Sequence, residues 1–230
     1  MTTTNVRPTD LNYHHYSNNK YDRDIINSIP FHQELHQRMV KYLRKNFDSE
    51  KNYSILDLGA GTGITSGVIK NELPNAELTL VDFSRQMMAG AKKRLGKTVK
   101  YIFGDYAKLK FHKKYNIIVS VVSIHHQNHR GKKLLFKKIY SSLKPGGIFI
   151  FGDLMSYKDP AMAALNFARH LHHLVEKSTD EKTLKEWAHH YCEVNDLAPI
   201  EDQIAWLEAV GFTVKLEMLK INTALLICKK

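Results

Sequence analysis

A glycine-rich turn with two nearby acids is the part of this chain best suited to binding a ligand. The turn, residues 59–63, reads G-A-G-T-G and follows the apolar run 54–58, which contains Asp57. A second apolar run, 78–81, leads into Asp82. Such runs are typical of buried parallel strands, and glycines let a backbone approach a ligand closely. A carboxylate at the tip of the second strand can accept hydrogen bonds from a ribose diol, so the spacing predicts a nucleoside-binding α/β site.

The charge beside the turn indicates which nucleoside is bound. The dinucleotide pattern G-x-G-x-x-G would need a glycine where Ile64 stands. A diphosphate binds best to bare backbone N–H groups at a helix start, and Asp57 would repel it. The same carboxylate would attract a cation such as the amino and sulfonium groups of S-adenosylmethionine. The pattern therefore favours S-adenosylmethionine over NAD.

Four further motifs follow the turn in order. They are D-F-S-R-Q-M-M at 82–88, F-G-D-Y at 103–106, Y-N-I-I-V-S at 115–120 and L-K-P-G-G at 143–147. Together with the turn, they resemble the class I S-adenosylmethionine-dependent methyltransferases of the small-molecule type. The resemblance covers residues 52–153 strongly and the last two strands moderately. It implies an α/β fold with a Rossmann-like seven-stranded sheet, mostly parallel, whose last strand is antiparallel.

The resemblance also implies a set of cofactor-binding residues. In this family the acid matched by Asp82 binds the ribose hydroxyls, apolar residues after it flank the adenine, and the acid matched by Asp105 meets the adenine amino group. The expected cofactor-binding residues are Asp57, Gly59, Ala60, Gly61, Gly63, Asp82, Phe83, Met87, Gly104, Asp105, Tyr106 and Ser120.

Catalytic residues are harder to predict, because methyl transfer from a sulfonium depends mainly on holding the acceptor in line with the methyl group. His125 follows the fourth strand at the edge where ligands bind in such folds, and its imidazole could serve as a general base. Asp153 ends the fifth strand, where it could meet the substrate or cap the following helix. Tyr16, Tyr21 and His126 are expected to cover the cofactor or contact the substrate, although core packing would also account for the two tyrosines.

We expect no metal site and no disulfide framework. The histidines at 170, 172, 173, 189 and 190 form no H-x-x-x-H pair with a supporting acid. Cys192 and Cys228 are too few for a metal set or a disulfide scaffold, and a reduced, cytoplasmic setting is the expectation. A radical mechanism would need a cysteine cluster that the chain lacks.

The chain divides into four segments. Residues 1–48 are predicted to form an N-terminal helical cover, 49–153 the cofactor-binding core, 154–200 an inserted helical cap, and 201–230 a closing helix and strand pair. Helices are expected at 31–47, 61–72, 84–95, 131–143, 160–177, 183–192 and 201–210, the third strand at 99–103, and the closing strands at 212–219 and 222–228.

The charge of the chain suggests a second class of partner. Among the 230 residues the net charge is +11, and residues 92–144 hold fifteen Lys or Arg but one acid. Such a surface could bind RNA, although solvated helix faces are the simpler interpretation. No segment approaches the ~20 apolar residues of a membrane span.

The acceptor is expected to be a small molecule methylated at O or N. The region after the fourth strand lacks the D/N/S-P-P-Y/F/W step typical of amino-methylating nucleic-acid enzymes, and the cap favours an enclosed substrate. Residues 187–212 also resemble the subfamily containing carboxy-S-adenosylmethionine synthase, but the stretch 189–195 lacks that enzyme's carboxylate-binding arginine. An RNA-directed enzyme, a carboxy-transferring enzyme and a non-catalytic cofactor-binding protein remain alternatives, and a homodimer is possible.

Overall fold

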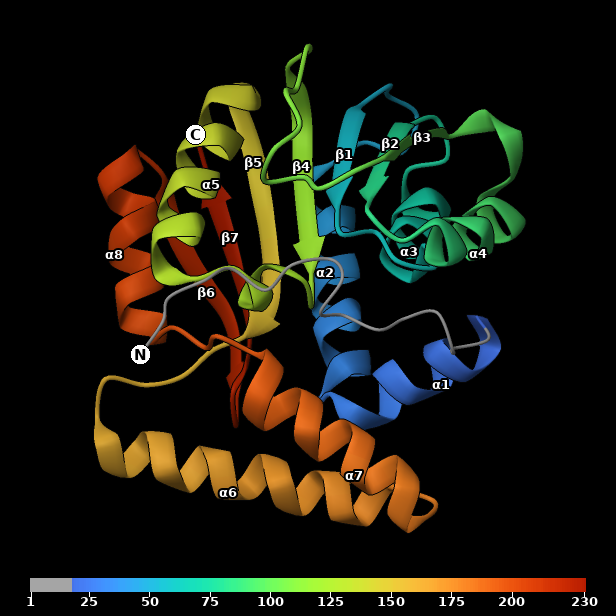
Figure 1. Cartoon of the computed structure of the whole chain (residues 1–230). Coiled ribbons are helices and arrows are strands. Elements are labelled where there is room, and N and C mark those ends of the chain that lie inside the picture. Colours follow the sequence, from blue (N-terminus) through green and yellow to red (C-terminus); the bar gives the residue numbers. More distant parts are fainter. Residues whose placement is uncertain (1–17) are drawn as a thin grey trace.

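A seven-stranded sheet with helices on both faces forms the centre of the molecule (Figure 1). The computed structural model describes residues 18–230. The strand order is β3-β2-β1-β4-β5-β7-β6, in which β7 runs antiparallel to both neighbours and the other pairings are parallel. This confirms the predicted Rossmann-like methyltransferase sheet. The strands are β1 (Ser54–Leu58), β2 (Glu77–Asp82), β3 (Lys100–Phe103), β4 (Tyr115–Val121), β5 (Leu143–Leu154), β6 (Thr213–Lys220) and β7 (Thr223–Lys229).

The helices occupy the two faces of the sheet and the edge formed by the carboxyl ends of its parallel strands. The α-helices are α1 (Asn18–Ser28), α2 (His32–Asn46), α3 (Ile64–Glu72), α4 (Arg85–Leu95), α5 (His129–Ser142), α6 (Pro160–Lys177), α7 (Glu181–His189) and α8 (Ile200–Val210). Short 3₁₀ turns stand at η1 (Gly96–Thr98) and η2 (Ile124–His126), and η3 (His190–Val194) is a π-helical turn.

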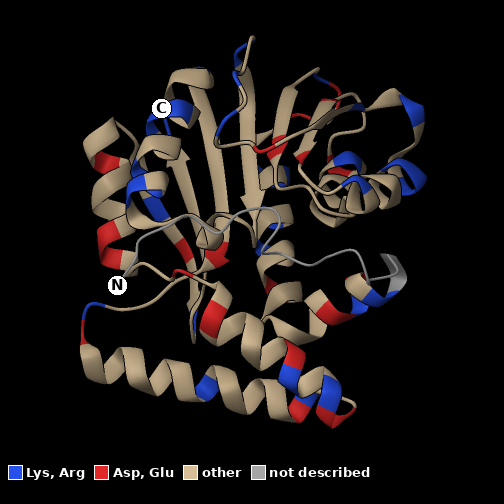
Figure 2. Ribbon diagram, in the orientation of Figure 1, with Lys and Arg blue, Asp and Glu red and all other residues tan. Residues whose placement is uncertain are grey.

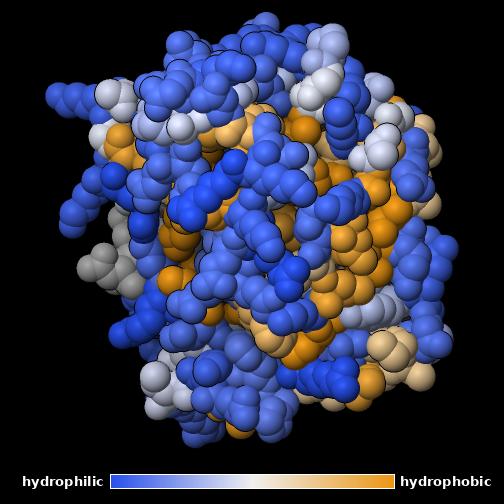
Figure 3. Space-filling model, turned by 180° about the vertical axis from the view of Figure 1, so that it is seen from behind, coloured by the Kyte–Doolittle hydropathy of each residue, from blue (hydrophilic) through white to orange (hydrophobic). Residues whose placement is uncertain are grey.

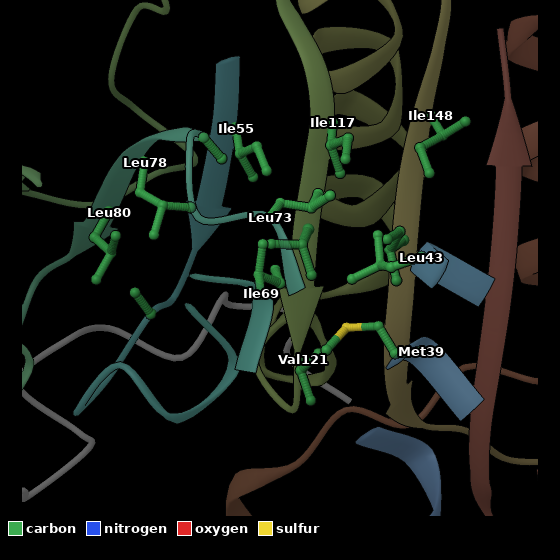
Figure 4. Packing of buried hydrophobic residues seen from close by; sticks show 14 of the residues in the cluster. Met39, Leu43, Ile55, Ile69, Leu73, Leu78, Leu80, Ile117, Val121 and Ile148 are labelled. Carbon is green, nitrogen blue, oxygen red and sulfur yellow. The ribbon is translucent and has the colours of Figure 1, made fainter. Parts of the chain in front are cut away.

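Alternate residues of the strands supply two hydrophobic layers. On one face Ile55 and Ile117 pack with Ile69 of α3 and with Met39 and Leu43 of α2 (Figure 4). On the other face, Leu56, Ile118 and Phe149 pack with Phe136 of α5 and Leu207 of α8. Because side chains on a strand point alternately to opposite faces, a continuous apolar run such as that of β1 places apolar groups in both layers.

Side-chain hydrogen bonds cap the first turns of two helices. The Ser84 hydroxyl accepts a hydrogen bond from Met87 N at 3.3 Å, which caps α4 as its sequence predicts. Asp159 caps α6 in the same way through Met162 N. The prediction of a helix from residue 61 was wrong, because Gly61 and Gly63 have φ values of 54° and 78° and α3 begins only at Ile64.

The inserted segment forms helices below the carboxyl ends of the parallel strands, where α6 and α7 lie beside α1 (Figure 1). The predicted helix at 160–177 is confirmed as α6. The predicted helix at 183–192 was partly wrong, because α7 ends at His189 and the chain continues as η3. A small apolar cluster of Ile29, Leu174, Trp187 and Tyr191 joins α6, α7 and η3 to the residue that follows α1.

The basic residues of segment 92–144 do not gather on one face. Those of α4 and those of α5 lie at opposite flanks of the molecule, because β1 and β4 stand between the strands that these helices cover (Figure 2). Many of them form ion pairs or hydrogen bonds with neighbouring groups of the chain. Arg94 pairs with Asp22, Lys113 with Glu77, and Lys132 is buried with its ammonium on the carbonyls of Gln127 and Asp196.

The surface is largely polar. Seen from behind, apolar side chains appear in patches among polar ones (Figure 3). Among the described residues, no helix combines the length and the apolar character needed to cross a bilayer.

We predict that Gly59→Ala destabilises the fold through a clash at the turn after β1. An added Cβ would lie 2.0 Å from Ser123 Oγ and 2.6 Å from Ser123 Cβ. Gly146 is the matched control, because its φ of 70° is close to that of Gly59 and no described atom lies within 4 Å of its added Cβ. Both variants carry the left-handed strain of ~1–2 kcal/mol, so Gly59→Ala should lose a further ~1–3 kcal/mol in denaturant unfolding. Equal losses in the two variants would contradict the clash.

Candidate functional site

The turn after β1 forms one wall of a pocket, and α1 lies opposite. Gly61 opens toward this space, since a Cβ added to it would lie 3.8 Å from the ring and the hydroxyl of Tyr21. The Asp22 carboxylate accepts a hydrogen bond from the Thr62 hydroxyl and pairs with Arg94, which ties α1 to the turn. The pocket is lined by Tyr21, Ile25, His32, Gly59, Ala60, Gly61, Thr62, Ile64, Thr65, Val121 and Val122.

Asp82 holds the turn in place from the tip of β2. Its Oδ2 accepts a hydrogen bond from Gly61 N at 2.8 Å, and its Oδ1 accepts one from Ser84 N at 2.7 Å. Burial raises the pKa of this carboxyl, and the backbone hydrogen bonds from Ser84 and Gly61 oppose that shift. The backbone of Phe83 forms a third such hydrogen bond, and a carboxylate has about four acceptor sites, so Asp82 can accept one further hydrogen bond.

Asp57 lies inside β1, two residues before the turn. Its side chain is 1% exposed, and its Oδ2 accepts a hydrogen bond from the Ser66 hydroxyl at 2.6 Å. Burial raises the pKa of Asp57 to about 7, with a smaller contribution of the same sign from Asp82. A nearby positive charge would lower this pKa again, because it favours the ionised form.

The remaining predicted cofactor residues surround the turn or support it. Met87 is buried in α4, and Phe83 lies between Asp82 and the Ser84 cap. Gly63 packs against α4, since an added Cβ would lie 3.2 Å from both Ala91 and Leu95. Ser120 lies within the sheet, where its hydroxyl donates to Leu58 O at 2.8 Å and joins β4 to β1.

The segment after β3 reaches the same region. Gly104 N donates to Asp82 O at 2.9 Å, and the Asp105 carboxylate accepts a hydrogen bond from Ala107 N at 2.8 Å. The Tyr106 hydroxyl donates to Ser123 O at 3.2 Å, and burial raises the pKa of Tyr106. These bonds connect the loop after β3 to the loop after β4 beneath the turn.

The two predicted catalytic residues lie against each other. His125 Nδ1 is 2.5 Å from Asp153 Oδ1, and His125 N donates to Asp153 Oδ2 at 3.0 Å. Both side chains are buried, at 3% and 1% exposure. A carboxylate on Nδ1 holds the proton there, so Nε2 carries the lone pair. Asp153 does not cap α6, because Asp159 has that role.

The residues predicted to cover the site do not all lie together. Tyr21 lines the pocket, whereas Tyr16 lies outside the described residues. The His126 ring lies 4.0 Å from that of His125 and 5.2 Å from that of His190, measured between centroids. This three-histidine cluster could not be predicted from sequence spacing, because His190 comes from the cap.

Sequence reasoning missed several residues that line the pocket. Thr62 and Ile64 stand within or directly after the glycine turn, Val121 ends β4 and Val122 follows it, so position alone could have suggested them. Val122 has φ 52°, an unusual value for a β-branched residue. The other missed residues, Ile25, His32 and Thr65, come from helices and carry no local signal.

Comparisons with known proteins agree with this geometry. Residues 55–147 match the model of a protein family described as "Methyltransferase domain". The chain is 38% identical over 106 residues to malonyl-[acyl-carrier protein] O-methyltransferase 2 of Ilyobacter polytropus, a match that covers 45% of this chain and 40% of the relative. It is 31% identical over 147 residues to demethylmenaquinone methyltransferase of Leptospira interrogans, covering 61% and 58%. The chain thus spans about two fifths to three fifths of these relatives' lengths.

A solved structure of DhpI in complex with SAM and HEP shares the fold over the whole of both chains, with a TM-score of 0.69 and 15% identity. At that identity the likeness concerns the fold alone. Residues 55–147 therefore resemble a methyltransferase domain, and the chain as a whole has the class I methyltransferase fold.

Proposed function

We propose that the protein transfers a methyl group from S-adenosylmethionine to an oxygen or nitrogen atom of a small molecule. The observation that carries the proposal is the pair of buried carboxylates, Asp57 and Asp82, on either side of a glycine turn that opens into a pocket. Two acids at one ligand site favour a cationic nucleoside over a dinucleotide phosphate.

The turn fits such a cofactor. Gly61 leaves space between the backbone and Tyr21, and Asp82 stands at the edge of that space with a lone pair for a ribose hydroxyl. Phe83, Met87 and Asp105 are the residues that we propose around the adenine, with Tyr106 and Ser120 supporting the loops. The bound sulfonium supplies an activated methyl group with a neutral leaving group, so the protein's main task is to orient the acceptor.

Oxygen is the favoured acceptor atom, because the first relatives named above are O-methyltransferases of malonyl-[acyl-carrier protein]. We propose that His125 Nε2 meets the acceptor group, with Asp153 fixing the orientation of the ring. The cap helices α6 and α7 lie over this edge of the sheet, and they would enclose the acceptor.

The alternatives are less well supported. The basic residues of α4 and α5 lie on opposite flanks, which disfavours a continuous RNA-binding surface. Carboxy transfer would need a cation for the extra carboxylate, and the matching stretch, residues 189–195, holds no arginine or lysine. A non-catalytic cofactor-binding protein would bind S-adenosylmethionine but show no turnover across a panel of hydroxyl, carboxyl and amine acceptors.

Asp57 should make both stability and cofactor affinity depend on pH. Its pKa in the folded chain is about 7, above the ordinary value of 3.8 for an aspartate. The folded state therefore favours the protonated carboxyl, and the stability that this gives is present below pH ~4 and is lost as the pH rises toward 7. Asp57→Asn should remove this loss and therefore raise the free energy of unfolding at pH 8. Since one pKa unit corresponds to about 1.4 kcal/mol, the gain should be a few kcal/mol at most.

The ionised carboxylate favours the cationic cofactor, so the affinity of the natural protein for S-adenosylmethionine should increase between pH 6 and 8. Calorimetry and denaturant unfolding at several pH values test both effects. Ser66→Ala, which removes only the hydrogen bond to Asp57, should keep a pH dependence. An Asp57→Asn variant with the same pH dependence as the natural protein would remove Asp57 from the cofactor site.

His125→Ala should separate acceptor chemistry from cofactor binding. Once an acceptor is found, we expect kcat to fall by about 10²–10⁴-fold, the range for loss of a positioned acid–base group. The dissociation constant of S-adenosylmethionine should stay within about twofold, since the proposed contact of His125 is with the acceptor and not with the cofactor. His129→Ala, at an exposed neighbouring position, is the control. An unchanged kcat in His125→Ala would refute the assignment.

A further inference from the structure

Three histidines converge where the loop after β4 meets the cap. His125 and His126 belong to η2, and His190 is the first residue of η3, sixty-four positions after His126 in the chain. Each offers one ring nitrogen, and the three nitrogens lie within 4.8 Å of one another. His125 and His126 are buried, and His190 is half-buried.

The three rings are close enough to share one ion. The ring centroids of His125 and His126 lie 4.0 Å apart, and those of His126 and His190 lie 5.2 Å apart. An imidazole nitrogen with a free lone pair can bind a metal ion. Sets of three histidines are typical ligands of zinc and related transition metals.

One ring nitrogen in the cluster lacks a partner. His126 Nδ1 is buried and has no hydrogen-bond partner among the described residues, whereas a backbone hydrogen bond with Val194 engages the ring's other nitrogen. Leaving a buried polar atom unsatisfied is energetically unfavourable, so such an atom calls for an explanation. A metal ion at the centre of the cluster would provide its partner.

His125 has the supporting contact that metal-binding histidines usually have. Its Nδ1 is held by Asp153, which leaves Nε2 as the available ligand atom. In metal sites this arrangement of carboxylate, histidine and metal fixes the ring orientation and makes the ligand more basic.

We propose that His125, His126 and His190 form a binding site for a divalent transition metal ion, with Zn²⁺ as its probe. Three protein ligands leave a fourth tetrahedral position for water or for an acceptor oxygen, as in catalytic rather than structural zinc sites. The buried Lys132 ammonium opposes the ion's charge, and the Asp153 carboxylate offsets it. With an ion bound, His125 Nε2 is a ligand, and the fourth position of the ion, in place of the imidazole, meets the acceptor. Metal binding itself can be tested without an acceptor.

The test is calorimetric titration of the full chain, first treated with a chelator, with ZnCl₂ at pH 7.5. We expect one tight equivalent in the natural protein and in His189→Ala, which removes the exposed neighbour of His190. His190→Ala and His126→Ala should lose that equivalent, and Asp153→Asn should bind about 10–100-fold more weakly. Circular dichroism and thermal unfolding of each variant show whether it is folded.

Co²⁺ gives a second readout, because a tetrahedral Co²⁺ site produces strong visible absorption. The natural protein should show these bands, and His190→Ala should not. The proposal is wrong if the natural protein binds no stoichiometric Zn²⁺, a result that does not depend on whether any variant folds. It is equally wrong if His189→Ala abolishes binding while His190→Ala preserves it, since the ion would then sit on surface histidines.

Discussion

The hydrogen bond from Gly61 N to the Asp82 carboxylate is the interaction on which the site depends. It joins the tip of β2 to the turn after β1 and places a buried acid beside a backbone that has no side chain in the way. The same carboxylate accepts Ser84 N at the start of α4, so one group organises the turn, the second strand and the next helix. Replacing it would therefore disturb the shape of the pocket as well as its charge.

Around this point the sheet and α1 form the two sides of the pocket. The sheet supplies a core in two apolar layers, so the carboxyl ends of β1, β2 and β4 are held in register. The opposite wall of the pocket comes from α1, which is fastened to the turn by Asp22 through polar contacts with Thr62 and Arg94. Apolar packing adds to these polar contacts, because Ile25 of α1 and the following Ile29 join the cluster that includes Leu174 and Trp187.

Local sequence patterns predicted the central fold well. The apolar runs, the glycine turn and the capping residue Ser84 each depend on neighbours in the chain. The mostly parallel seven-stranded sheet and its antiparallel closing strand followed from the family resemblance. The errors lie at boundaries. Three positive-φ glycines delay α3, and the change from α-helix to π-helix after His189 depends on tertiary packing around Tyr191.

The candidate site was predictable only where it lies within a motif. The turn and its acids were found from sequence, and the juxtaposition of His125 with Asp153 follows from the adjacency of β4 and β5. His32 and Ile25 line the pocket from the N-terminal helices, and His190 reaches His126 from the cap. These contacts join segments far apart in sequence, so spacing alone could not reveal them.

The central claim is that two carboxylates beside the glycine turn select a cationic nucleoside. Calorimetric titration of the full chain with S-adenosylmethionine and, separately, with NAD tests it most directly. The account predicts saturable one-to-one binding of S-adenosylmethionine and no detectable binding of NAD. Binding of NAD in preference to S-adenosylmethionine, or binding of neither, would contradict it.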